Sequence, residues 1–245
     1  MAIGSHGVAS AEHTTTAEFV RVDRNYEIAR TNYLTARTNF TLAWQFGRVC
    51  FDRAEFATNS TERATLADQG ITACRGAIAS KPASAEAHYY HAMNLGQMAR
   101  TKSLGALKLV SKMEREFGTA RSLDERLDFA GPDRNLGLLY FEAPGWPTSI
   151  GSRTKARHHL RRAVELAPQH PENHLCLLEA YLYWGDHNTA QRELKALTDL
   201  WPIARTNLVG EDWAAAWNDW EKRRKQAQAK LEKTPSAIVS PRQKE

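Results

Sequence analysis

Residues 156–202 decide the fold, and they read ARHHLRRAVELAPQHPENHLCLLEAYLYWGDHNTAQRELKALTDLWP. Four positions recur thirty-four residues later: Ala156, Leu160, Ala163 and Pro168 return as Ala190, Leu194, Leu197 and Pro202. The first three positions of each copy lie on one helix face, because they are spaced four and three residues apart. The proline is predicted to end that helix and to lead into the next. The stretch therefore predicts similar helix pairs in succession.

A thirty-four-residue period with this content is typical of the tetratricopeptide repeat, which packs two antiparallel helices per unit. The same spacing occurs upstream at Gly70, Cys74, Ala77 and Pro82. We therefore predict an all-α fold, in which antiparallel helix pairs stack as a solenoid.

About four helix pairs are expected over residues 41–202, with an added helix at each end. Residues 15–233 form one helical domain in this prediction. The ends of the chain, 1–14 and 234–245, are polar and are predicted to be a disordered leader and tail.

Aromatic and small residues alternate at heptad-like spacing over residues 19–50, which predicts one long helix or two nearly collinear helices. The stripe is expected to cover the first repeat from within the chain. The alternative is a seam between two copies, that is, a homo-oligomer. At the other end, residues 209–233 predict an amphipathic last helix, whose Trp213, Trp217 and Trp220 dock on the end of the array.

The net charge of +5 is located at the C-terminus. Residues 221–245 contain eight Lys and Arg against three Glu, so the rest of the chain is neutral and no nucleic-acid partner is predicted. No apolar run is long enough for a transmembrane segment. The three cysteines, Cys50, Cys74 and Cys176, are interpreted as buried small apolar side chains.

Enzymatic chemistry has little support in this sequence. Histidines cluster only at His158–His159 and at His170 with His174, and a helix start at Pro171 separates the second pair. We predict no metal site and no cofactor. No phosphate-binding loop, nucleophile elbow or spaced acid/base pair is recognisable, so catalytic residues are predicted to be none.

Binding is the better-supported function, because the first helices of such pairs line the concave face of a solenoid. The repeat register places the following residues on that face: Gln45, Val49, Asp52, Glu86, Tyr89, Met93, Gln97, Arg134, Leu138, Phe141, Glu172, Leu175, Glu179 and Tyr183. The candidate binding residues are Tyr89, Tyr90, Met93, Gln97, Arg134, Phe141, Trp146, Glu179 and Tyr183. The alternative is that the terminal helices pack against this face and fill it.

Residues 143–151, APGWPTSIG, interrupt the repeat pattern with two prolines and two glycines. We predict an ordered loop that folds back onto the array with Trp146 at least half buried, since an exposed indole is costly. The indole is expected either to wedge near Tyr140 and Trp184 or to wall a ligand cavity beside Tyr89, Tyr90 and Arg134.

Residues 131–140 (GPDRNLGLLY), the APGWP loop and Lys155–Arg157 resemble a group of exported bacterial tetratricopeptide proteins. That group is similar to the T-component of periplasmic TRAP (tripartite ATP-independent) transporter systems. The resemblance implies a periplasmic accessory protein that binds a partner protein or a small apolar or organic-acid ligand. The segment 87–102 also resembles, more faintly, the regulator-of-microtubule-dynamics group. A lipid anchor does not follow, because no cysteine lies near the N-terminus.

Two functions therefore remain after the sequence is read. The first is an exported, non-catalytic binding protein of a solute transport system, whose signal peptide is not in this sequence. The alternative is a cytoplasmic adaptor for protein–protein interactions that uses the concave face.

Overall fold

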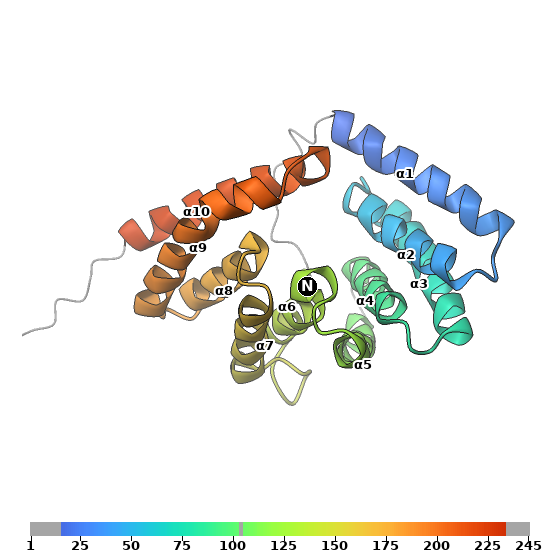
Figure 1. The fold of residues 1–245 in the computed structure, drawn as a ribbon. Helices are drawn as coiled ribbons and strands as arrows, with labels where there is room; N and C mark the ends of the chain where they lie inside the picture. Colours follow the sequence, from blue (N-terminus) through green and yellow to red (C-terminus); the bar gives the residue numbers. More distant parts are fainter. Residues whose placement is uncertain (1–15, 103–104, 234–245) are drawn as a thin grey trace, which may run out of the picture. The chain divides into compact units, whose positions relative to one another are not determined.

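A computed structural model describes residues 16–102 and 105–233 of the chain (Figure 1). The chain divides into two compact units, residues 1–168 and 169–245. All regular structure in the described ranges is helical, apart from one isolated bridge between Gly145 and Gly151. The all-α prediction is confirmed. The predicted leader and tail lie outside the described residues.

Residues 16–102 and 105–168 of the first unit form seven helices: α1 (Thr16–Thr35), α2 (Phe40–Glu55), α3 (Ser60–Ser80), α4 (Ala85–Arg100), α5 (Ala106–Leu123), α6 (Leu127–Glu142) and α7 (Arg153–Leu166). Consecutive helices pack as pairs, α2 with α3, α4 with α5 and α6 with α7. The first helices of the pairs are also neighbours, α2 beside α4 and α4 beside α6. This is the arrangement that the thirty-four-residue period predicts.

Glycine makes the close packing within and between pairs possible. A Cβ atom on Gly137 of α6 would lie 2.7 Å from Cγ of Leu160 on α7. On Gly47 of α2, it would lie 2.2 Å from Sγ of Cys74 on α3. Gly137 thus permits the close approach of α6 and α7. Cys50, Cys74 and Cys176 are buried free thiols, as predicted.

Residues 19–50 form neither one long helix nor two nearly collinear helices, so this prediction of the sequence analysis is wrong. The helix ends at Thr35, and Asn39 caps α2 by accepting hydrogen bonds from the N–H groups of Thr41 and Leu42. α1 packs back along α2 in antiparallel fashion, with Tyr26 and Tyr33 both against Phe46. The aromatic stripe thus packs within the chain, and the homo-oligomer remains a prediction.

The second unit contains α8 (Pro171–Tyr183), α9 (His187–Asn207), the 3₁₀ turn Glu211–Trp213 and α10 (Ala214–Glu232). α9 continues through Pro202, where the sequence analysis ended a helix. The buried Leu200 and Ala204 on either side of Pro202 offset the hydrogen bond that proline cannot donate. α10 packs on α8 and α9 with Trp217 and Trp220 buried, so the predicted docking of the last helix is confirmed.

A histidine–carboxylate pair joins the two helices of three pairs. His88 Nδ1 on α4 lies 2.6 Å from Glu116 Oε2 on α5. In α6 and α7 the order is reversed, with Asp133 Oδ1 2.7 Å from His159 Nδ1. In the second unit, His174 Nδ1 on α8 lies 2.5 Å from Glu193 Oε1 on α9. We call these three contacts the interhelix pairs.

Candidate functional site

α6 begins with three consecutive residues in the left-handed region: Asp128 (φ 50°), Phe129 (φ 54°) and Ala130 (φ 63°). The repeat pattern predicts one regular helix over residues 123–142, and that prediction is wrong at these three residues. Left-handed conformations of residues other than glycine are uncommon and cost of order 1 kcal/mol or more each. Such a turn persists only where its surroundings hold it, and contacts from α4, α5 and α7 do so here.

On the α4 side, Asp128 is fixed by a buried tyrosine. The phenol of Tyr89, 1% exposed, donates a 2.6 Å hydrogen bond to Asp128 Oδ2. Asn135 Nδ2 donates to the same phenol oxygen at 3.0 Å. Burial and the charge of Asp128 raise the pKa of Tyr89 well above its usual range, so the phenol stays a neutral donor.

Arg134 binds the same turn from within α6. Its Nη2 lies 2.9 Å from Asp128 Oδ2, and its Nη1 donates to the carbonyl oxygens of Asp128 and Phe129 at 3.3 Å. Arg134 therefore helps to hold the turn, and its part in a ligand site stays a prediction.

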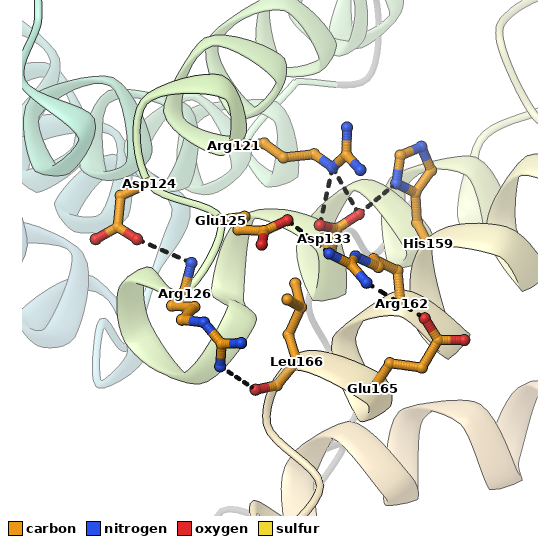
Figure 2. Close-up of polar contacts among 9 residues, drawn as sticks. All are labelled: Arg121, Asp124, Glu125, Arg126, Asp133, His159, Arg162, Glu165 and Leu166. Carbon is orange, nitrogen blue, oxygen red and sulfur yellow. Dashed lines mark hydrogen bonds and ion pairs between the residues drawn. The ribbon is translucent and has the colours of Figure 1, made fainter.

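The opposite side of the turn is held by α5 and α7, as Figure 2 shows. Asp133, fully buried, accepts hydrogen bonds from Arg121 Nε at 2.8 and 2.9 Å and contacts His159. Burial raises the pKa of Asp133, but the hydrogen bonds from His159 and Arg121 outweigh burial and hold it below the usual value. Farther along, Arg126 Nη1 donates to the carbonyl of Leu166 at 2.9 Å.

The polar surface of α2 and α4 next to this turn forms the candidate site. We call it the first-helix face; it comprises Arg48, Asp52, Glu55, Tyr90, Met93, Gln97, Arg100 and Asp128. The ring of Tyr90 stacks on Trp44 at a centroid distance of 5.9 Å. Arg100 Nη1 contacts both oxygens of Glu55 at 3.0 Å, and Gln97 also donates to Glu55.

Asp52 is a carboxylate of this face whose pKa is raised. Its side chain is 41% exposed, so water reaches it. Partial desolvation nevertheless raises its pKa to about 6, and the negative charges of Asp128 and Glu55 add to the rise, against the opposing effect of Arg48. The negative charges of Glu55 on α2 and of Asp128 at the start of α6 thus act on Asp52, which favours a cationic group as the ligand of this face.

The candidate residues of the first unit, apart from Trp146, lie on α4 and α6. Tyr89, Tyr90, Met93, Gln97 and Arg134 lie on α4 or on α6 beside it, while Phe141 is half-buried near the end of α6. Val49, predicted on the concave wall, instead packs in the cluster formed with α1.

The candidates of the second unit are not part of this face. Glu179 on α8 accepts hydrogen bonds from Arg223 of α10 at 2.8 and 2.9 Å, and Glu172 contacts Arg223 and Trp220. The terminal helix therefore covers the α8 carboxylates, as the alternative in the sequence analysis anticipated. Tyr183, at the end of α8, is 78% exposed.

Trp146 is 88% exposed, so the prediction of a half-buried indole is wrong. The loop is ordered by its own backbone instead: Gly151 N–H donates to the Pro144 carbonyl at 2.8 Å, and Ser152 N–H donates to that of Tyr140 at 2.9 Å. These bonds close the loop without using the indole. Neither the wedge nor the cavity wall is formed by Trp146.

Sequence reasoning missed Asp128, Glu55, Arg100 and Arg223. The Arg48–Asp52 spacing of four residues is a recognisable signal for a polar helix face. For Asp128, the sequence offers the dipeptide Gly131–Pro132, which marks a turn close by, but nothing in it predicts that the three residues before Gly131 are left-handed. Within the described ranges, no group of three or more His, Cys, Asp or Glu side chains could hold a metal ion.

Solved structures share this architecture at low sequence identity. The crystal structure of TTC0263, a thermophilic TPR protein of Thermus thermophilus, is 15% identical, covers 87% of this chain and 93% of its own, and superposes with a TM-score of 0.61. The fold is that of a tetratricopeptide repeat protein. A crystal structure of MamA, 14% identical, covers 76% of this chain and 92% of its own with a TM-score of 0.53.

A sequence-family comparison points to one further group. The family described as regulator of microtubule dynamics protein 1-3 matches residues 9–115 of this chain. That range includes residues 87–102, on which the fainter resemblance in the sequence analysis depends, and ends within α5. No curated protein matches the chain by sequence.

Proposed function

We propose that this chain is a non-catalytic scaffold that binds a segment of a partner protein on the first-helix face. The supporting observation is Asp52, whose carboxylate is influenced by the negative charges of Glu55 and Asp128 and lies on the same face as the Tyr90–Trp44 stack. Helix-pair repeat proteins use their first helices for recognition, and the fold is of that class.

The chemistry of the face selects the partner. A Lys or Arg side chain would stabilise the charged form of Asp52, which burial and the neighbouring carboxylates disfavour. An apolar or aromatic neighbour would pack on the ring of Trp44, against which the buried Tyr90 stacks. We therefore propose a segment with a basic residue next to an apolar one. Acidic carboxyl-terminal peptides, which need cationic clamps, do not fit this face.

A peptide array tests the proposal directly. We expect the protein to retain peptides that contain a basic–apolar pair and to lose them when the basic residue is replaced by Glu. Asp52→Asn combined with Glu55→Gln should weaken binding about tenfold or more, the cost of removing the partners of one desolvated charge. Asp68→Asn, at an exposed carboxylate on the second helix α3, is the matched control and should bind normally. Equal retention of acidic and basic peptides would contradict the proposal.

A second candidate follows from the family match over residues 9–115. Because the family name refers to microtubule dynamics, we propose co-sedimentation with microtubules as its test. Binding that Asp52→Asn with Glu55→Gln abolishes would identify a microtubule component as the partner of the first-helix face. Protein that stays in the supernatant at all tubulin concentrations removes this candidate.

For the cellular context, we propose that the chain is an exported accessory protein of a TRAP-type transport system. In that role it would bind a partner protein or a small apolar or organic-acid ligand. This proposal is supported only by the resemblance of residues 131–140 and of the APGWP loop. Transporter genes beside the natural gene, together with a signal peptide upstream of residue 11, would support it. A native start at Met1 without transporter neighbours would favour the cytoplasmic adaptor instead.

A further inference from the structure

The loop between α6 and α7 presents an apolar side chain that nothing in the proposed function uses. Trp146 is 88% exposed, and its neighbour Pro147 is exposed as well. Figure 1 draws this segment as a loop that extends past the end of α7. Its backbone hydrogen bonds hold the indole outward in a fixed loop, where water contact is unfavourable.

The chain next to this loop has only positive charges. Residues 143–164 contain five Lys and Arg and two His but no Asp or Glu. Arg153 and Lys155 lie in the first turn of α7, which contains no acidic residue, and both are exposed. Basic side chains at a helix N-terminus are disfavoured by the helix dipole, so local helix stability does not account for them.

Carboxylates of neighbouring helices lie near two of these basic residues. Lys155 Nζ lies 3.8 Å from Glu114 Oε1, and Arg162 contacts Glu125 on the inner side. The side chain of Lys155 is still 57% exposed, and Arg161 is exposed two turns along α7 from Arg153. The loop and the start of α7 thus combine one exposed indole with a surface of positive charge.

We propose that Trp146, Pro147, Arg153 and Lys155 form a docking surface for an anionic lipid bilayer. An indole is stable at the level of the lipid headgroups, and basic residues are attracted to anionic lipids. We propose a membrane rather than a protein as the partner, because the apolar part of this surface is limited to the projecting Trp146 and its neighbour Pro147. A protein interface of ordinary size requires a contiguous apolar patch and a matching pocket, whereas a bilayer accepts a projecting ring without either.

The docking is peripheral and reversible. No helix in the described residues is both long and apolar enough to cross a bilayer. Each basic residue near an anionic surface contributes about fivefold in binding, and the indole adds about tenfold. Binding requires both the indole and the basic residues. We therefore expect it to weaken as the salt concentration rises, when Trp146 is replaced, and when Arg153 and Lys155 are replaced.

Vesicle co-sedimentation of the full chain tests this proposal. We expect binding to phosphatidylcholine vesicles that contain phosphatidylserine, and little binding to pure phosphatidylcholine. Trp146→Ala should reduce binding about tenfold, and Arg153→Gln with Lys155→Gln about twentyfold. The matched controls are Val209→Ala, an exposed apolar residue elsewhere, and Lys108→Gln with Lys112→Gln on α5; both should bind as the unmodified chain does.

The variants change exposed side chains, and a circular dichroism spectrum checks that each is folded. Vesicles that contain brominated lipids add a second readout, because they should quench part of the unmodified protein's fluorescence and none of the Trp146→Ala protein's remaining fluorescence. No sedimentation with anionic vesicles, or sedimentation unchanged by Trp146→Ala, would overturn the proposal. Binding to polyglutamate but not to vesicles would also overturn it, in favour of an acidic protein partner.

Discussion

Tyr89→Phe tests whether the left-handed turn at the start of α6 is held by α4. The substitution removes one oxygen, which donates to Asp128 Oδ2 at 2.6 Å and accepts from Asn135 Nδ2 at 3.0 Å. Asn135 keeps a second partner, the Gly131 carbonyl, at 2.9 Å. The lost bond to a charged acceptor should lower the free energy of unfolding by about 2 kcal/mol.

A double-mutant cycle separates this bond from general packing. Asp128→Asn is the second variant, because asparagine tolerates the left-handed conformation as aspartate does and so leaves backbone strain unchanged. It removes the charge, which is paired with Arg134, at a side chain that is 39% exposed. We expect a cost of about 1 kcal/mol for this variant and a coupling to Tyr89→Phe of about 1 kcal/mol.

Urea unfolding measured by circular dichroism gives the free energies of unfolding of the two single variants and the double variant relative to the unmodified chain. Hydrogen exchange of the amides at 128–134 gives the change in local stability of the turn. Exchange there should accelerate in Tyr89→Phe, while exchange in α10 of the other unit should not. A coupling below about 0.3 kcal/mol would mean that the two side chains act independently, and the account of the turn given above would be wrong.

Three further substitutions have defined outcomes. Gly137→Ala should destabilise by about 2 kcal/mol or more in thermal unfolding, because its Cβ would lie 2.7 Å from a buried α7 side chain and 3.0 Å from its backbone nitrogen. Asp52→Asn should stabilise by on the order of 1 kcal/mol above pH 6 and by little below pH 4, because a folded-state pKa raised to about 6 makes the wild type lose stability as pH rises through that window. Glu116 has the opposite sign: burial raises its pKa, but the nearby imidazoles of His91 and His88 outweigh burial and lower it to about 2. Glu116→Gln should therefore cost roughly 3 kcal/mol at pH 7, and the difference should shrink as pH falls from about 4.5 towards 2.

The helix pairs were predictable because their information is local and periodic. Small residues such as Ala156, Ala163 and Ala190 recur at positions where helices touch, and each is fully buried. The aromatic stripe of residues 19–50 predicted helical packing within the chain, but it did not show that Asn39 would start a new helix that folds back. Spacing alone cannot distinguish a continuous helix from two antiparallel ones, because both repeat every three to four residues.

The candidate site was predicted in part, for a similar reason. Tyr89, Tyr90 and Gln97 were found because the repeat register places them on a first helix. Asp128 was not, because its left-handed conformation is held by Tyr89 of α4 and by Arg134 of α6, and residue spacing does not predict these contacts. Trp146 was predicted to be half buried because exposing an indole to water is unfavourable. That argument does not consider the backbone hydrogen bonds, which order the loop without any contact from the indole.

The interhelix pairs also constrain how this chain can misfold. His88–Glu116, Asp133–His159 and His174–Glu193 each place a mostly buried carboxylate opposite one particular residue of the next helix. Apolar helices of similar sequence could otherwise slide by one turn or exchange partners between repeats at little cost. A slipped or exchanged helix would leave a desolvated carboxylate without its hydrogen-bond donor, at a cost of several kcal/mol. The polar contacts therefore favour the native helix pairing over alternative pairings of similar apolar packing. Each helix pair thus keeps one register although the repeats have similar sequences.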